Sequence, residues 1–161
     1  MDNDLLSPTL TIEDESIGID EPWNPNIILF ITFFFGLITG GLLLAYNFGR
    51  LGMGKYLRLT IIITIFLATI ISVCTFLLIA ENIIDVKNSK EKTLLRVGQR
   101  GLSLFIAFCI IRKQRKRYRL AQMCDIENGS LWSPAIAAIV AAIFIGGFIN
   151  GVVKIIVIGL P

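Results

Sequence analysis

Three long apolar runs without any charged residue dominate the pattern of hydrophobic and polar positions along the chain. They cover residues 27–46, 59–80 and 134–153. A helix rises ~1.5 Å per residue, so a run of about 20 residues can cross a hydrocarbon core of ~30 Å. The pattern therefore predicts an all-α integral membrane protein, built as a compact bundle. Its three transmembrane helices are expected at about 25–47, 59–81 and 134–158.

The chain before the first run is acidic. Residues 1–22 hold seven Asp and Glu and no Lys or Arg. Because this stretch lacks a sustained apolar face, we expect a disordered tail, followed by a single membrane domain over residues 23–161. Trp23 suits the headgroup region, Asn24 is a good N-cap, and Pro25 suits the first helical position. The first helix should therefore begin at Pro25.

A fourth, weaker segment covers residues 94–123. Its apolar centre, residues 102–111, is too short to cross a bilayer alone, and residues 94–111 reach the length only by including charged side chains. A helix would gather its polar side chains on one side: Arg96, Gln99, Arg100 and Ser103. The segment is either a short span shielded by its neighbours or a helix at the interface. We favour the short span, which gives four membrane segments, with a charged helical extension to about residue 123.

That extension carries the densest charge in the chain, since residues 112–119 hold six bases in eight positions. The six are Arg112, Lys113, Arg115, Lys116, Arg117 and Arg119. Such a cluster beside a membrane segment attracts anionic lipid headgroups at about 1 kcal/mol per charge, and an acidic protein partner is the alternative. Nucleic acid is not expected, because the run has one aromatic residue and belongs to no recognisable reading module.

The same residues orient the chain, because Lys and Arg in short loops favour the cytoplasmic side. Two topologies are compatible with the sequence. Four membrane segments with the N-terminus outside place nine bases in the cytoplasm. If residues 94–111 lie at the interface and the N-terminus is inside, eleven bases lie there. Both topologies place residues 112–119 on the cytoplasmic side.

Small residues recur at steps of four along the long apolar runs. The first run contains Gly36 and Gly40, and the last contains Ala138, Ala142 and Gly146. Helices in lipid associate through close packing, which small side chains permit. We expect these positions to pack helices within the bundle, or against a second copy or another membrane protein.

The chain offers little for catalysis. It has no histidine, and its three cysteines form no CxxC pair. Glu81 and Asp85 follow the second run, where helix exits are commonly polar. Asn150 and Lys154 fall near the far end of the last run, where Lys154 can reach the interface. We therefore expect no catalytic, cofactor-binding or metal-binding residues, and no cofactor.

Part of the chain resembles a known group of proteins. The residues concerned are Trp23-Asn-Pro25, Phe35-Gly36, Gly40-Gly41, Asn47 and Arg50-Leu51-Gly52. They are similar to the opening of a group of small, uncharacterised bacterial membrane proteins, in which an x-Pro entry leads into a Gly-rich helix ending in Asn, Arg and Leu-Gly. The resemblance covers about 30 residues and implies a bacterial cytoplasmic (inner) membrane. It brings no known activity.

These observations favour a non-enzymatic, multi-pass membrane protein that acts as an interaction, assembly or accessory subunit. The alternative is a small transporter or channel component, for which a polar lumen is needed. The three apolar runs contain Thr, Ser and Asn but no ionisable group near mid-depth, which argues against proton or ion coupling.

Overall fold

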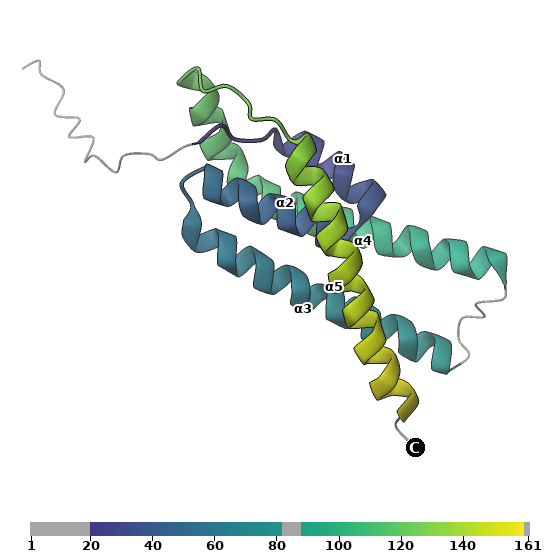
Figure 1. Cartoon of the computed structure of the whole chain (residues 1–161). Coiled ribbons are helices and arrows are strands. Elements are labelled where there is room, and N and C mark those ends of the chain that lie inside the picture. Colours follow the sequence, from purple (N-terminus) through teal and green to yellow (C-terminus); the bar gives the residue numbers. More distant parts are fainter. Residues whose placement is uncertain (1–19, 82–87, 160–161) are drawn as a thin grey trace, which may run out of the picture.

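A computed structural model describes residues 20–81 and 88–159, and within these ranges the chain forms helices and no strand. The order is α1 (Pro25–Phe35), α2 (Leu37–Arg50), α3 (Gly54–Ala80), α4 (Ser89–Met123) and α5 (Trp132–Gly159) (Figure 1). By length and composition α3, α4 and α5 can each cross a membrane, which indicates a membrane protein. Most of the predicted disordered tail, residues 1–19, lies outside the described residues.

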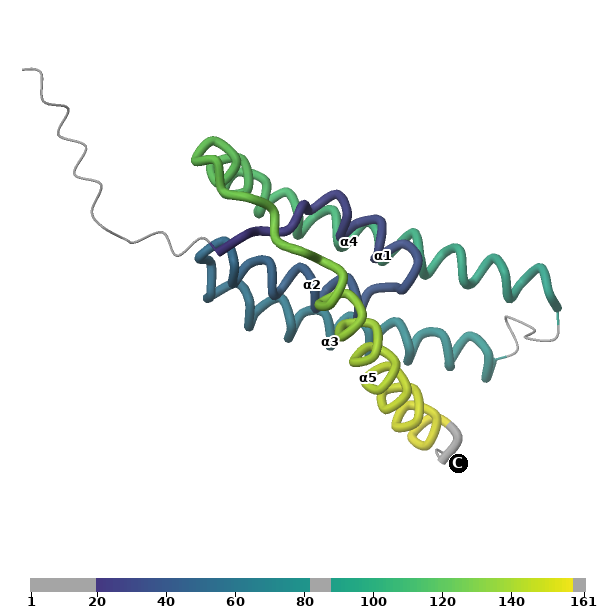
Figure 2. Tube along the Cα trace, turned by 45° about the horizontal axis from the view of Figure 1, so that its top comes forward, coloured from purple at the N-terminus to yellow at the C-terminus, as the bar shows by residue number. Residues whose placement is uncertain are grey.

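The first apolar run is not one spanning helix, and this prediction is wrong. Gly36 interrupts it with φ 87° and ψ −176°, a backbone conformation that is essentially restricted to glycine. The chain reverses there, so α1 and α2 lie antiparallel as a hairpin (Figure 2). Hydropathy is the same for one long helix and for two half-length helices, and so the sequence pattern did not separate them.

The hairpin defines two ends of the molecule. At one end, here called the closed end, α1 begins and α2 ends, and Asp20 N–H donates to the Arg50 carbonyl at 2.9 Å. At the other, the open end, α3 and α5 finish and α4 begins (Figure 1). With 11 and 14 residues, α1 and α2 rise only ~17 and ~21 Å, against ~40 Å for α3. The hairpin therefore reaches about half the length of the bundle.

The hydrophobic core lies in the closed half. It consists of Trp23, Ile28, Leu43, Leu44, Ala107, Ile111 and Ala138. The hairpin supplies most of this core. In the bundle α4 packs on α1 and α2, whereas α3 and α5 pack on α2 and on each other. Beyond the hairpin tip, no further helix of the described residues fills the space between α3, α4 and α5.

The long helices extend further than the sequence pattern predicts. The predicted start of α4 at residue 94 is late, because Asn88 caps the helix and its side chain accepts from Lys90 N–H at 3.1 Å. The helix then continues through residues 112–119 to Met123 without a break, so the charged extension is helical as predicted. At the first helix the prediction is confirmed: Asn24 is the N-cap and Pro25 occupies the first turn.

The predicted packing residues serve different purposes. Gly36 packs against nothing, since a Cβ there would meet no atom within 4 Å; it is a turn residue. A Cβ on Gly40 would overlap the side chain of Thr32, so this glycine lets α2 approach α1 inside the hairpin. On α5, Ala138 is in the core, Ala142 is half-buried, and a Cβ on Gly146 would lie 3.5 Å from Ile38.

Candidate functional site

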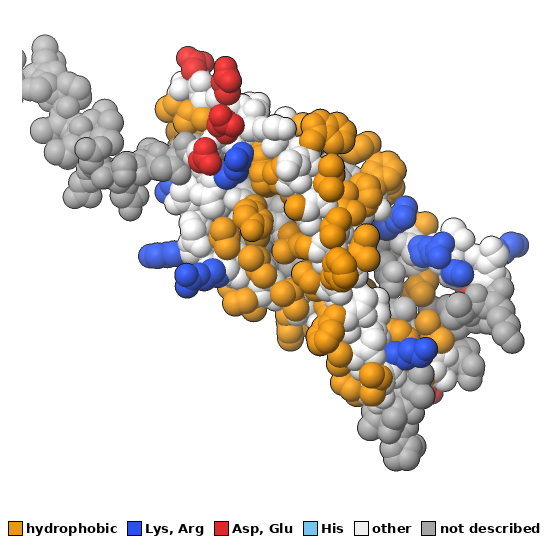
Figure 3. Space-filling view, viewed as in Figure 1, with side chains coloured by type: hydrophobic (Ala, Val, Ile, Leu, Met, Phe, Trp, Pro, Cys, Tyr) orange, Lys and Arg blue, Asp and Glu red, His pale blue; other side chains and the backbone are white. Residues whose placement is uncertain are grey.

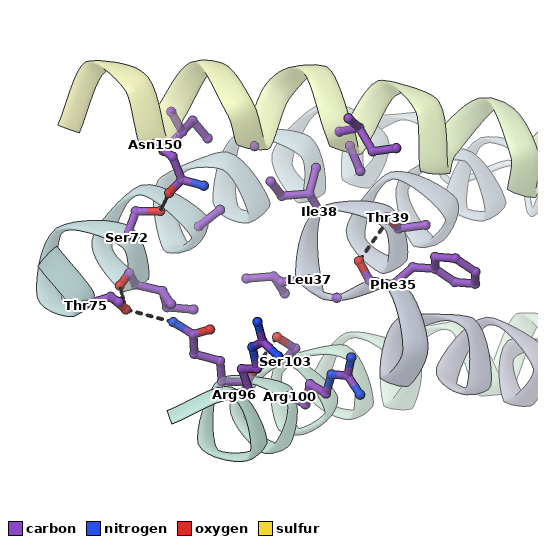
Figure 4. A pocket seen from close by; sticks show the side chains of 18 of the residues that line it. Phe35, Leu37, Ile38, Thr39, Ser72, Thr75, Arg96, Arg100, Ser103 and Asn150 are labelled. Carbon is purple, nitrogen blue, oxygen red and sulfur yellow. Dashed lines mark hydrogen bonds between the residues drawn. The ribbon is translucent and has the colours of Figure 1, made fainter. Parts of the chain in front are cut away.

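A cavity of about 600 Å³ lies beyond the hairpin tip, in the open half of the bundle. Its floor is the turn between α1 and α2, and its walls come from α3, α4 and α5 (Figure 4). It exists because the hairpin stops halfway, so the three long helices border an open space that no described helix fills.

One wall of the cavity is polar and positively charged. It is the α4 face made of Arg96, Gln99, Arg100 and Ser103, the four side chains that helical spacing predicts on one side. Figure 4 shows Arg96, Arg100 and Ser103 on the side of α4 that borders the cavity, with Arg96 extending toward the hairpin tip. Gln99 donates to the Thr75 hydroxyl at 2.8 Å, which links α4 to α3. Ser103 donates to the Gln99 carbonyl at 2.7 Å.

Among the described residues, the two arginines of this wall have no acidic counterpart in the cavity. No Asp or Glu is among the described residues that line it. Within residues 20–81 and 88–159, neither Arg96 nor Arg100 forms an ion pair. Their positive charge is therefore uncompensated by the described part of the chain.

The opposite walls combine one polar pair with apolar side chains. Ser72 on α3 donates to the Asn150 amide oxygen on α5 at 2.8 Å. Asn150, expected near the far end of the last span, thus ties two helices together at the rim of the cavity. The remaining lining is largely apolar and includes Phe34, Phe35, Ile139 and Ile143.

The hairpin tip presents the start of α2 to the cavity. The N-cap of α2 is Gly36, which provides no side-chain hydrogen bond to the first turn. The first backbone N–H groups of a helix have no intrahelical partner, and the helix dipole places partial positive charge there. Leu37 and Ile38 belong to the cavity lining, so this positive helix end faces the same space as the arginines.

A buried amide pair holds the closed end together. The Asn47 side-chain oxygen accepts a hydrogen bond from the Trp23 backbone N–H at 2.8 Å, and the Asn47 side-chain nitrogen donates to the Trp23 carbonyl at 3.2 Å. These two bonds close the mouth of the hairpin. Asn47 also donates to the Gln114 side-chain oxygen at 3.0 Å, and Gln114 donates to the Leu44 carbonyl at 2.7 Å. Both amide side chains are fully buried. The hairpin is thereby fixed to α4.

Arg50 adds a second clamp at this end. Its guanidinium donates to the Glu21 carbonyl at 2.6 Å, lies 3.8 Å from the Asp20 carboxylate, and sits 4.7 Å from the centre of the Trp23 ring. A Cβ on Gly129 would overlap this arginine, so the segment before α5 passes directly over it. The clamp joins the start of α1, the end of α2 and the α4–α5 connection.

The predicted lipid-contact residues mostly stay on the surface of α4. Arg112, Lys113, Arg115, Lys116 and Arg119 are exposed, and Arg117 is half-buried. Arg115 and Arg119 line a cleft of about 210 Å³ together with the start of α1. The two neutral residues of the run, Gln114 and Tyr118, face inward instead. The sequence contained the signal, because Ser103, Ala107, Ile111 and Gln114 are uncharged residues at steps of three or four along α4.

No group of three or more His, Cys, Asp or Glu side chains comes together among the described residues. The three cysteines are exposed and unpaired with one another. The chain matches no protein-family model, no curated protein and no solved structure.

Proposed function

We propose that this is a non-enzymatic membrane protein that binds another molecule in the cavity beneath its hairpin, as a small transport component. The observation that supports the proposal most is the half-length hairpin above a cavity with one polar, positively charged wall. A polar lumen is what a transport component needs and what an all-apolar bundle lacks. The α4 wall of the cavity supplies a polar surface of this kind in one half of the protein.

The surface supports a membrane location. In Figure 3 hydrophobic side chains cover the middle of the visible face, whereas basic side chains gather toward its two ends. Nine of the fifteen Lys and Arg belong to segments at the closed end, residues 50–58 and 112–119. By the preference of basic loops for the cytoplasm, the closed end faces the cytoplasm and the N-terminus lies on that side. The resemblance described above favours a bacterial cytoplasmic membrane.

This topology differs from both alternatives that the sequence left open. The hairpin enters and leaves the membrane on the same side, so α3, α4 and α5 are the three spans, and the C-terminus lies outside. Residues 112–119 remain on the cytoplasmic side in all three topologies. Residues 94–111 become part of a full span instead of a short or interfacial segment.

The depth of the cavity follows from helix geometry. Gln114 marks the level of the hairpin mouth, and Arg100 and Arg96 lie 14 and 18 residues before it on α4. At ~1.5 Å per residue the two arginines are ~21 and ~27 Å below that level, in the outer half of a ~30 Å core. Charged residues within spans usually face the bundle interior or a water-filled cavity.

The hairpin itself supports a role in binding. Irregular backbone at membrane depth is tolerated where it is buried in protein or lines an aqueous cavity. Many secondary transporters use broken helices whose half-helix N-termini point at anionic substrate groups. The turn at Gly36 and the start of α2 have this arrangement.

A pair of cysteine variants on α3 tests whether the cavity is open to water. Ala68 lines the cavity, whereas Phe66, two positions away and at similar depth, is 64% exposed on the outer surface. In a background without the native cysteines, Ala68→Cys should react with a small membrane-impermeant thiol reagent in intact cells, because thiols react as thiolates in water. Phe66→Cys should not. An unreactive Ala68→Cys would contradict the proposed function.

A second candidate function is that of an interaction or assembly subunit, and the outer face of α5 favours it. A Cβ added at Gly147 or Gly151 would meet no atom within 4 Å, although small residues on a membrane helix commonly mark a helix contact. Gly147→Leu should then leave the isolated protein folded but abolish association with a second copy or another membrane protein. Unchanged association, measured by cross-linking in membranes, would argue against this candidate.

A further inference from the structure

We propose that the cavity is a binding site for the anionic headgroup of a membrane phospholipid from the outer leaflet, held by Arg96 and Arg100. The inference rests on the proposed function, since it requires the cavity to be open in the outer half of the membrane. It assigns the class of ligand, which the shape of the bundle alone does not do.

The two arginines are placed to act on one group. They are four residues apart on α4, so they lie one above the other on the same helix face. Both line the cavity from exposed positions of α4, and Figure 4 shows the Arg96 side chain extending toward Leu37 and the Arg100 side chain lying beside α4. A guanidinium group matches the geometry of a phosphate, to which it donates two parallel hydrogen bonds. The start of α2 adds partial positive charge from the cavity floor.

These arginines differ from Arg50, which has partners within the chain. Arg50 contacts the Asp20 carboxylate, the Glu21 carbonyl and the Trp23 ring. Arg96 and Arg100 form no ion pair with a described residue, and the part of the cavity lining that the structure describes includes no carboxylate. Two like charges one turn apart repel each other, and an anion between them removes that repulsion.

The rest of the lining distinguishes a phospholipid from a free inorganic anion. Phe34, Phe35, Ile139 and Ile143 provide apolar surface that a bare phosphate cannot use. A phospholipid uses both kinds of wall, because its phosphate contacts the arginines and its glycerol and upper acyl carbons contact the apolar side chains. The volume of about 600 Å³ lies within the range of small-molecule pockets, ~300–1,000 Å³. Basic pockets between transmembrane helices bind anionic headgroups on the matrix or cytoplasmic side of membranes, and the same chemistry applies to a basic pocket that opens to the outer leaflet.

The experiment must separate this cavity from the exposed bases of residues 112–119, which also attract anionic lipid. We therefore use Ala68→Cys as a probe inside the cavity, in a cysteine-free background reconstituted in vesicles. The rate of modification by a neutral, water-soluble maleimide is measured in pure phosphatidylcholine and with increasing phosphatidylglycerol. A second probe, Lys90→Cys, sits at the exposed start of α4 and corrects for the surface potential of the vesicle.

We expect phosphatidylglycerol to slow modification of the cavity probe at least fivefold relative to the Lys90→Cys probe. The double variant Arg96→Gln/Arg100→Gln should lose this protection. Lys92→Gln, which removes a charge from an exposed position of the same helix outside the cavity, should retain it. Adding inorganic phosphate or glycerol phosphate to pure phosphatidylcholine vesicles should protect little.

Each outcome decides the matter. If the cavity probe reacts quickly in every lipid mixture, the lipid site is wrong while the open cavity stands. If inorganic phosphate protects as well as phosphatidylglycerol, the ligand is a free anion and the lipid assignment is overturned. If the probe is unreactive even in pure phosphatidylcholine, the proposed function fails with it. The comparison of lipids needs no arginine variant, so misfolding of the double variant does not remove the test.

Discussion

Asn47 and Gln114 are 67 positions apart in the sequence and share a hydrogen bond of 3.0 Å between fully buried side chains. Asn47 closes the mouth of the hairpin through its two bonds to Trp23, and Gln114 connects that closed hairpin to α4. The pair explains why a neutral residue stands at position 114 among the six bases of residues 112–119. A charged side chain at this position would be buried without a counter-ion, which is costly.

The first prediction concerns this pair. Gln114→Leu keeps a side chain of similar size but leaves one Asn47 N–H without its partner, so it should lower the free energy of unfolding by ~1–3 kcal/mol. The loss should appear as a lower melting temperature in mild detergent. Lys116→Gln, a change at an exposed position of the same run, is the control and should melt like the unmodified protein. Equal melting of the two variants would show that the amide pair contributes nothing.

The second prediction concerns the turn of the hairpin. Gly36→Ala meets no atom within 4 Å, so any effect comes from the backbone alone. At φ 87° and ψ −176° a Cβ costs ~1–3 kcal/mol, and the variant should melt at a lower temperature. Gly98→Ala, inside α4 and also in open space, should be neutral or slightly stabilising. If Gly36→Ala is as stable as Gly98→Ala, the first run does not turn at this residue.

The third prediction concerns the close approach of α1 and α2. Because a Cβ on Gly40 overlaps the Thr32 side chain, Gly40→Leu should destabilise the bundle by ~1–3 kcal/mol or more, although it makes the helix more apolar. Leu44→Ala should also be destabilising, since Leu44 is fully buried in the core and does not face lipid. Phe30→Leu, on the exposed side of α1, is the control and should melt like the unmodified protein. Melting temperatures in detergent should therefore be lower for Gly40→Leu and Leu44→Ala than for Phe30→Leu.

The fourth prediction concerns sidedness. In a cysteine-free background, Lys116→Cys should resist a membrane-impermeant thiol reagent in intact cells and react after permeabilisation. Glu81→Cys, at the end of α3, should react in intact cells. Asp20→Cys should behave like Lys116→Cys, because the hairpin returns the chain to its starting side. Labelling of Asp20→Cys in intact cells would restore a first run that crosses the membrane.

Much of the fold follows from hydropathy and local signals, because these act over short distances. The apolar runs locate α3 and α5, Asn24 and Pro25 mark the start of α1, and helical spacing gathers Arg96 and Arg100 on one face. The sequence thus predicted that these side chains share one face of α4. It did not predict that this face lines a cavity, because the cavity depends on where the hairpin ends.

The hairpin escaped prediction for a physical reason. A glycine is common in membrane helices, and nothing near Gly36 distinguishes it locally from Gly40, which remains helical. The difference is tertiary: Asn47 finds its partners on Trp23 and Gln114 only when the chain has turned back. Asn47, the polar residue at the end of the first apolar run, was the available signal for a hairpin. A polar residue is equally common where a single spanning helix leaves the membrane, so this signal did not distinguish the two.

The hairpin also has a consequence for biogenesis. Insertion machinery responds to hydropathy as the chain emerges, and by that measure the first run qualifies as a span. The Trp23–Asn47 bonds can form once α2 is synthesised, but the bond from Gln114 awaits 67 further residues. The hairpin of α1 and α2 therefore has all of these hydrogen bonds only when most of α4 is present. Nascent chains that end before Gln114 lack the Asn47–Gln114 bond. The hairpin of α1 and α2 therefore reaches its final hydrogen-bonded arrangement late in synthesis.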